Sequence, residues 1–303
     1  MKTVQIEFVP RSGANYSPAA AAAYNDGMIP LRDNIPSRTA PIVNYLMIAV
    51  CGLAFFAQLA DQTDGVDHLV ENLGLIPARV LHPDETIVVP EVKLVRGYYG
   101  VERQVVEREL PPPVVSPWLT LFTCIFLHGG WMHFLGNMWF LHIFGDNVED
   151  RFGHFGYLLL YLGCGVAASL AHLAFNSTST MPTIGASGAI AGVMGAYLWL
   201  YPRANVLTLV PIIFFFQIMV IPAPVFLVIW FVLQFFEGAF SVTAGQAGGV
   251  AWWAHVGGFA AGFLVALLLD RSHHLRPPVE AVLPNTERPT YYGYRRPPSI
   301  FDN

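Results

Sequence analysis

Ser187 and His255 are the two residues of this chain whose types and placement could support nucleophilic chemistry. Ser187 lies in Gly185–Ala186–Ser187–Gly188, where a polar loop turns into an apolar segment, and His255 lies in a second apolar segment 68 residues later. A serine hydroxyl becomes a nucleophile when a histidine accepts its proton. Because both residues lie at membrane depth, the pair suggests a hydrolase that works inside the lipid bilayer.

The glycines around Ser187 let the chain turn sharply and bring backbone N–H groups close to a reacting carbonyl. Ser187 also opens the apolar segment, so its own N–H is among the donors at a helix start that lack an intrahelical partner. Such a donor suits an oxyanion hole, the set of groups that binds the negative oxygen formed during acyl transfer. The alternative is that Ser187 only caps the helix, as a serine before an apolar run commonly does.

His255 occurs in Ala254–His255–Val256–Gly257–Gly258, inside an apolar segment. Ionisable residues are rare and costly there, so the imidazole requires a partner or a task. Gly188 begins a row of small residues on one segment and Gly258 begins another, and such rows let helix backbones approach closely. Close approach would allow a direct hydrogen bond from Ser187 to His255. The alternative is a packing seam that contains a structural histidine.

A third group of polar residues lies in 128–137, at the entry to another apolar segment. His133 and Asn137 are four residues apart and therefore project from one face of a helix. Both can donate hydrogen bonds to a developing oxyanion, which is commonly the largest catalytic contribution. The alternative for either residue is a polar clamp between helices. His128, at the start of the group, is interpreted as structural.

The composition indicates that these residues lie in a protein embedded in a lipid bilayer. The chain is 54% apolar and 12% charged, with a mean hydropathy of +0.48, which is typical of a polytopic membrane protein. Crossing the hydrocarbon takes about 20 mostly apolar residues of helix, and six segments qualify: 42–60, 131–148, 155–175, 187–201, 224–240 and 252–270. Pro211, Pro222 and Pro224 argue against one continuous helix through the apolar run 206–236, and we interpret 206–221 as a separate segment. We expect that segment not to span, and either to be buried against the bundle or to lie in the interface.

The basic residues orient the predicted spans. Eleven of the 16 Lys and Arg residues fall on the side of the two termini. By the positive-inside rule both ends are cytoplasmic, and Ser187 lies at the outward end of its helix. The predicted organisation is a cytoplasmic segment at 1–41, a membrane domain at 42–270 with a large external first loop at 61–117, and a flexible cytoplasmic tail at 271–303.

Other membrane chemistries find less support in the sequence. The His-Glu-x-x-His motif of a zinc protease is absent, and the apolar segments hold no pair of aspartates for an acid dyad. The acidic residues around Arg151 are interpreted as an anchor at the membrane boundary. The three cysteines are interpreted as small apolar residues. No metal, organic cofactor or nucleic-acid partner is expected.

Four motifs make residues 41–270 resemble the rhomboid family of intramembrane serine proteases. They are Gly185–Ala186–Ser187–Gly188, Ala254–His255–Val256–Gly257–Gly258, His133-x-x-x-Asn137 preceded by His128, and Glu149–Asp150–Arg151–Phe152–Gly153. The resemblance implies an all-α bundle of six transmembrane helices. It implies that Ser187 is the nucleophile and His255 the general base of a dyad without a carboxylate. It further implies an oxyanion hole made by His133, Asn137 and the Ser187 N–H, with support from His128, Gly185, Gly188 and Gly258.

Two positions depart from the pattern of the relatives. Many relatives carry a Trp-Arg pair in the first loop, whereas Trp118 is followed by Leu119 in this chain. Some relatives place an aromatic residue one turn after the serine, beneath the histidine, and this chain has Ala191 there. The support of His255 must therefore come from elsewhere in the fold.

The resemblance leads us to expect an endopeptidase that cleaves transmembrane segments of other membrane proteins near the outer face of a bilayer, in the bacterial plasma membrane. Small or helix-breaking residues in a substrate would help, because a regular helix ties up its carbonyls in its own hydrogen bonds. Two other classes remain open. A non-catalytic relative that binds membrane clients would typically lack the serine or the histidine, and a transporter or channel would need polar residues on both sides of the midplane.

Overall fold

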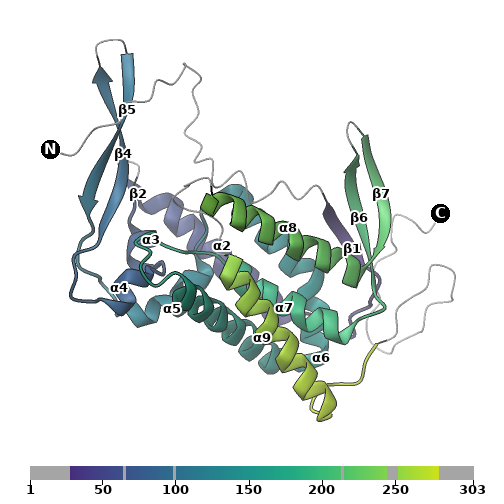
Figure 1. Ribbon diagram of the computed structural model, residues 1–303. Coiled ribbons are helices and arrows are strands. Elements are labelled where there is room, and N and C mark those ends of the chain that lie inside the picture. The colour runs from purple at the N-terminus through teal and green to yellow at the C-terminus, as the bar shows by residue number, and fades with distance from the viewer. Residues whose placement is uncertain (1–27, 64–65, 98–99, 213–214, 244–251, 280–303) are drawn as a thin grey trace.

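The structure, a computed structural model, describes residues 28–63, 66–97, 100–212, 215–243 and 252–279. Apolar helices form a bundle, and strands project from its two opposite ends (Figure 1). Within the described residues, three helices are long and apolar enough to cross a membrane, and further apolar helices are shorter. The protein is therefore mostly helical and membrane-embedded. Its main helices are α2 (Ile42–Asp61), α6 (Trp131–Phe175), α7 (Ser187–Leu200), α8 (Ala223–Thr243) and α9 (Trp252–Arg271).

A kink in α6 lies between two of the predicted spans, 131–148 and 155–175. Gly153 has backbone angles of φ 72° and ψ 165°, which are not helical and which side chains rarely allow. The space beside it is also occupied, because a Cβ added at Gly153 would lie 3.2 Å from a guanidinium nitrogen of Arg276. Glycine at this position thus serves both the backbone turn and the packing of the C-terminal segment.

Helix α7 is buried along most of its length and packs against α6 and α9. Its contact with α9 leaves no room for side chains. A Cβ added at Gly258 would lie 2.0 Å from the carbonyl oxygen of Gly188, and one added at Gly262 would lie 1.8 Å from that of Gly192. The predicted close approach of these two helices is therefore confirmed.

Antiparallel strands correct the prediction of an all-α fold. β6 (Asn205–Ile212) pairs with β7 (Phe215–Pro222), and β1 (Ile29–Asp33) pairs with the other edge of β6. The segment 206–221 is thus a β hairpin between α7 and α8. Its β-branched and aromatic residues favour strands, and Pro211 disfavours helix.

The predicted first loop, 61–117, folds into short elements. Arg79 is buried and donates hydrogen bonds to the carbonyl oxygens of Glu71 and Pro111, both at 3.0 Å. An arginine outside any Trp-Arg pair therefore ties together the two ends of the loop's ordered core. The elements are β2 (Gln62–Thr63), β3 (Val66–Asp67), α3 (His68–Leu73), α4 (Pro77–Leu81), the paired β4 (Val88–Gly97) and β5 (Gly100–Glu109), and η1 (Pro117–Leu119), with α5 (Thr120–Thr123) and η2 (Cys124–Phe126) leading into α6.

Glu149 of α6 caps the N-terminus of α2 from a distance. Its carboxylate, 1% exposed, accepts the backbone N–H groups of Val43 at 3.0 Å and Asn44 at 2.7 Å. These groups lie in the first turn of α2, whose N-cap residue, Pro41, makes no side-chain cap. The neighbouring Asp150 binds Arg38 at 2.8 Å. The acidic cluster near Arg151 thus joins α6 to the start of α2 and to Arg38, whereas its place at the membrane boundary stays a prediction.

The change Glu149→Gln is expected to destabilise the protein by about 2 kcal/mol. An amide offers one acceptor oxygen, and its NH₂ group would face the second backbone N–H, so a charge-assisted bond is lost and a buried donor is left unsatisfied. Unfolding by SDS in mixed micelles measures the change. Glu85→Gln is the control, because the Glu85 side chain is 73% exposed; an equal effect of the two substitutions would contradict the capping role.

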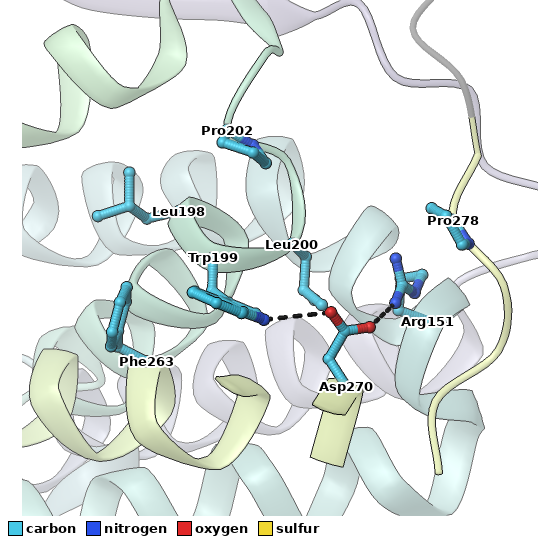
Figure 2. Close-up of a pocket in the computed structure, with 8 residues that line it drawn as sticks. All are labelled: Arg151, Leu198, Trp199, Leu200, Pro202, Phe263, Asp270 and Pro278. Atoms are coloured by element: carbon cyan, nitrogen blue, oxygen red, sulfur yellow. Dashed lines mark hydrogen bonds and ion pairs between the residues drawn. The ribbon is translucent and has the colours of Figure 1, made fainter. Parts of the chain in front are cut away.

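A cavity of about 390 Å³ lies where α7 ends, at the opposite end of that helix from Ser187 (Figure 2). Trp199 and Phe263 form its apolar wall, and an ion pair between Arg151 and Asp270 forms its polar side. Trp199 Nε1 donates to the second Asp270 oxygen at 3.2 Å. As far as the described residues go, none of the predicted site residues lines this cavity. Because its charges pair with one another, we interpret it as part of the scaffold that holds the end of α9.

Candidate active site

The structure brings Ser187 and His255 into direct hydrogen-bond contact. Ser187 is the first residue of α7, His255 lies in the first turn of α9, and the Ser187 Oγ to His255 Nε2 distance is 2.7 Å. The glycine contact between the two helices produces this separation, since Gly188 and Gly258 lie one and three residues from the pair. His255 is 5% exposed. The geometry is that of a nucleophile beside a general base.

The orientation of the imidazole follows from its contacts. If Nε2 accepts the serine proton, the neutral ring carries its own proton on Nδ1. Within the described part of the chain, Nδ1 has no hydrogen-bond partner. The described residues therefore show a contact between two side chains, Ser187 and His255, and no carboxylate on the second nitrogen.

His133 faces the same space from the first turn of α6. Its Nδ1 accepts the backbone N–H of Gly129 at 3.2 Å, which places the ring proton on Nε2. A Cβ added at Gly185 would lie 2.9 Å from that Nε2 and 3.5 Å from Ser187 Oγ. A proton donor and the serine oxygen therefore border one small space beside Gly185, where an oxyanion could be held.

Asn137 lies one turn further along α6 and is 7% exposed. Its Nδ2 is a buried donor that finds no acceptor among the described residues. Buried polar groups are rarely left without a partner, and exceptions are frequent at sites that receive a ligand. The predicted pairing of His133 and Asn137 on one helical face agrees with the structure, although their catalytic role stays a prediction.

Gly185 shapes the turn before the serine. Its φ is +135°, a value that favours glycine, and its N–H donates to the carbonyl oxygen of Cys124 at 2.9 Å. The loop before it is held by the first loop, because Thr183 and Leu75 exchange two backbone hydrogen bonds of 2.7 and 3.0 Å. The Thr183 hydroxyl also lies 2.9 Å from His172 Nε2. The backbone that offers the Ser187 N–H is thus fixed from two sides.

His128 supports the site indirectly. Its ring packs edge-on against that of His133, with 5.4 Å between centroids. Its backbone exchanges hydrogen bonds with the side-chain amide of Gln58, at 2.8 and 3.1 Å. Burial lowers the pKa of His128 to about 3, the nearby His133 adds to this effect, and the backbone of Phe126 opposes it. His128 is therefore neutral at pH 7 and forms one wall of the site.

Two side chains near the dyad were not predicted. Trp230 of α8 packs against His255, with ring centroids 5.8 Å apart and planes at 41°. His172 of α6 holds the loop before the serine through Thr183. Trp230 thus gives His255 an aromatic neighbour, in a chain that has Ala191 where some relatives carry an aromatic residue. The sequence gives no sign of it, because α8 contains several aromatic residues and only the packing shows which one meets the histidine.

Comparison with known proteins identifies rhomboid proteins as relatives of this chain. The family model for the rhomboid domain matches residues 116–272. The chain is similar to RHOMBOID-like protein 1 of Arabidopsis thaliana, 34% identical over 49% of this chain and 33% of that protein, and to RHOMBOID-like protein 5 of the same plant, 32% identical over 38% and 35%. It is also similar to rhomboid protease GluP of Bacillus subtilis, 42% identical over 27% of this chain and 16% of GluP. The chain thus matches about a third or less of the length of these relatives.

Proposed function

This chain belongs to the rhomboid family, whose domain matches more than half of its length, and on that premise we propose that it is a serine endopeptidase acting within the membrane. The observation that carries the proposal is the 2.7 Å contact between Ser187 Oγ and His255 Nε2. The donor-lined space beside Gly185 supports it, because acyl transfer needs both a nucleophile and a site for the oxyanion.

The proposed reaction proceeds in two steps. His255 Nε2 takes the proton of Ser187 Oγ as the oxygen attacks the scissile carbonyl carbon. The negative oxygen is bound by His133 Nε2–H, Asn137 Nδ2–H and the Ser187 N–H. His255 then gives its proton to the leaving amine, and the C–N bond breaks. A water molecule, with its proton taken by the same nitrogen, then attacks the acyl carbon. The bond from this carbon to Ser187 Oγ breaks, His255 gives the proton to Oγ, and the acid is released.

The proposed substrates are transmembrane helices of other membrane proteins. Ser187 lies at the first residue of α7, so the reacting atoms sit at one end of a helix and not at its middle. A substrate helix must unwind there, since its carbonyls are otherwise committed to its own hydrogen bonds. Small or helix-breaking residues near the end of a substrate span are therefore expected at the cleavage site.

The proposed topology has six spans, with α6 counted as two around Gly153. The distribution of Lys and Arg supports a topology with both termini in the cytoplasm and Ser187 toward the outer face. The membrane domain is assigned to 42–270, with the external loop at 61–117. The N-terminal segment 1–41 and the tail 271–303 flank it, and residues 1–27 and 280–303 lie outside the described residues. The bacterial plasma membrane is the proposed location.

The test uses the full-length protein in liposomes with a panel of single-span substrates and a fluorophosphonate probe that reacts with activated serines. Cleavage together with a probe adduct located on Ser187 by mass spectrometry would support the protease. Intact substrates and no adduct, in protein shown to be folded, would overturn it in favour of a non-catalytic client-binding relative. An adduct without cleavage would support an activated Ser187 and would show that none of the proteins in the panel is a substrate.

We assign Trp230 as a positioning residue for His255. The change Trp230→Leu is expected to lower kcat about tenfold with little change in KM, because misplacing a catalytic group by as little as 1 Å can cost on the order of 100-fold. Trp230→Phe is expected to retain most of the rate. The matched control is Phe226→Leu, a buried aromatic residue of the same helix that packs on Phe140 and Phe144. Equal losses of kcat per folded protein in the two leucine variants would contradict the assignment.

A further inference from the structure

The β6–β7 hairpin is an unusual connection between two apolar helices. β6 begins five residues after α7 ends, and β7 ends immediately before the first residue of α8. Because Ser187 opens α7, the hairpin lies at the opposite end of that helix from the dyad. In Figure 1 it stands out from this end of the bundle. The hairpin is thus attached, at both of its ends, to apolar helices.

The hairpin carries no charge and a large exposed apolar surface. From residue 204 to residue 236 the sequence has no Asp, Glu, Lys, Arg or His. The large apolar side chains of β7 are well exposed: Phe215 75%, Phe216 71%, Ile218 61%, Met219 43% and Val220 65%. Contiguous apolar surface of this kind on an uncovered edge strand would promote aggregation in water.

The exposed side chains lie on both faces of β7. Successive residues of a strand point to opposite faces, so Phe216, Ile218 and Val220 share one face, and Phe215 and Met219 share the other. A protein partner docked on a sheet covers one of its faces. Acyl chains and headgroups surround an inserted strand on both, so the distribution favours lipid over a second protein surface.

We propose that strand β7 inserts into the membrane leaflet opposite to the one at which Ser187 lies, at the boundary between headgroups and acyl chains. The depth is limited by the backbone. β7 is the edge of the sheet β1-β6-β7, and its outward N–H and C=O groups have no strand partner among the described residues. Each such group costs several kcal/mol in hydrocarbon but can be hydrated at the boundary. The hairpin is therefore a shallow anchor that fixes the joint between α7 and α8 in the plane of the membrane.

Spin labels can test this placement, since the three native cysteines are all buried. Phe216→Cys and Met219→Cys, on opposite faces of β7, are labelled with a nitroxide in protein reconstituted into phosphatidylcholine and phosphatidylglycerol vesicles. Collision with O₂, which concentrates in lipid, is compared with collision with a water-soluble nickel chelate. Glu85→Cys, on the exposed first loop, is the aqueous control, and protein without an added cysteine gives the background labelling.

Both β7 labels are expected to collide more with O₂ than with the nickel chelate. The label at position 85 is expected to show the opposite order. Nickel accessibility equal to that at position 85 would place the hairpin in water and overturn the proposal. Protection from both reagents, with dipolar broadening between labels, would also overturn it and identify a second copy of the chain as the cover. A lipid signal on one face alone would overturn insertion in favour of docking on the bundle. These outcomes do not depend on whether the chain is an active protease.

Discussion

Replacing either Ser187 or His255 with alanine is expected to lower substrate cleavage by at least about 10⁴-fold, and replacing both is expected to cost no more than the larger single loss. We expect the two residues to act as a unit, because in the described part of the chain His255 Nε2 is the hydrogen-bond partner of the Ser187 hydroxyl. Losses within such a unit are strongly non-additive. The 2.7 Å contact between Ser187 Oγ and His255 Nε2, buried where two helices meet, is the physical basis for treating them as one catalytic unit.

Cleavage rates in liposomes and labelling by the fluorophosphonate measure this coupling. Ser179→Ala and His142→Ala serve as controls, since they remove a serine from the same loop and a histidine from α6 without touching the dyad. Independent, additive losses for Ser187→Ala and His255→Ala would contradict the dyad. Cleavage that persists in Ser187→Ala would show that another residue is the nucleophile.

The change Gly185→Ala is expected to lower kcat by on the order of 100-fold or more, which is the cost of losing one oxyanion donor. The new methyl group would lie 2.8 Å from His133 Cε1 and 2.9 Å from Nε2, too close for the ring to keep its place. It would also occupy the space where the oxyanion forms. The φ of +135° adds strain of roughly 1–3 kcal/mol for a residue with a side chain, so some loss of stability is expected as well.

Gly129→Ala is the matched control for this substitution. A Cβ at Gly129 would lie 3.6 Å from His133 Nδ1, which is ordinary contact, and the N–H that binds this nitrogen would be retained. Rates are normalised to folded protein to separate the catalytic effect from the loss of stability. Similar kcat values for the two alanine variants would show that the space beside Gly185 is not the oxyanion hole.

The parts of the site that could be predicted are those encoded over short distances. The spacing of His133 and Asn137 fixes their common helical face, and the glycines near Ser187 and His255 indicate how closely their helices can approach. Hydropathy adds that the serine and the histidine both lie in apolar segments, which restricts both residues to the depth of the membrane. A small number of polar residues in an apolar chain leaves few possible partners for each.

The strands could not be predicted in the same way. Hydropathy counts apolar residues but does not identify their period, and segment 206–221 is apolar at nearly every position. Pro211 within it and Pro222 and Pro224 after it argue against one continuous helix but do not indicate which structure forms there. The pairing of β1 with β6 joins segments more than 170 residues apart, and no local pattern encodes it. The contact of Trp230 with His255 is likewise a product of helix packing.

The contact of Gly188 with Gly258 has a consequence for motion at the site. Most helix interfaces contain side chains that exchange rotamers on the picosecond to nanosecond scale, and such exchange lets neighbouring helices shift. At this crossing, backbone atoms touch with no side chain between them. The interface therefore contains no side chains that can rearrange, and contact between backbone atoms sets the minimum distance between the two helices. Thermal fluctuation elsewhere in the bundle can change access to the serine without changing its distance to the base.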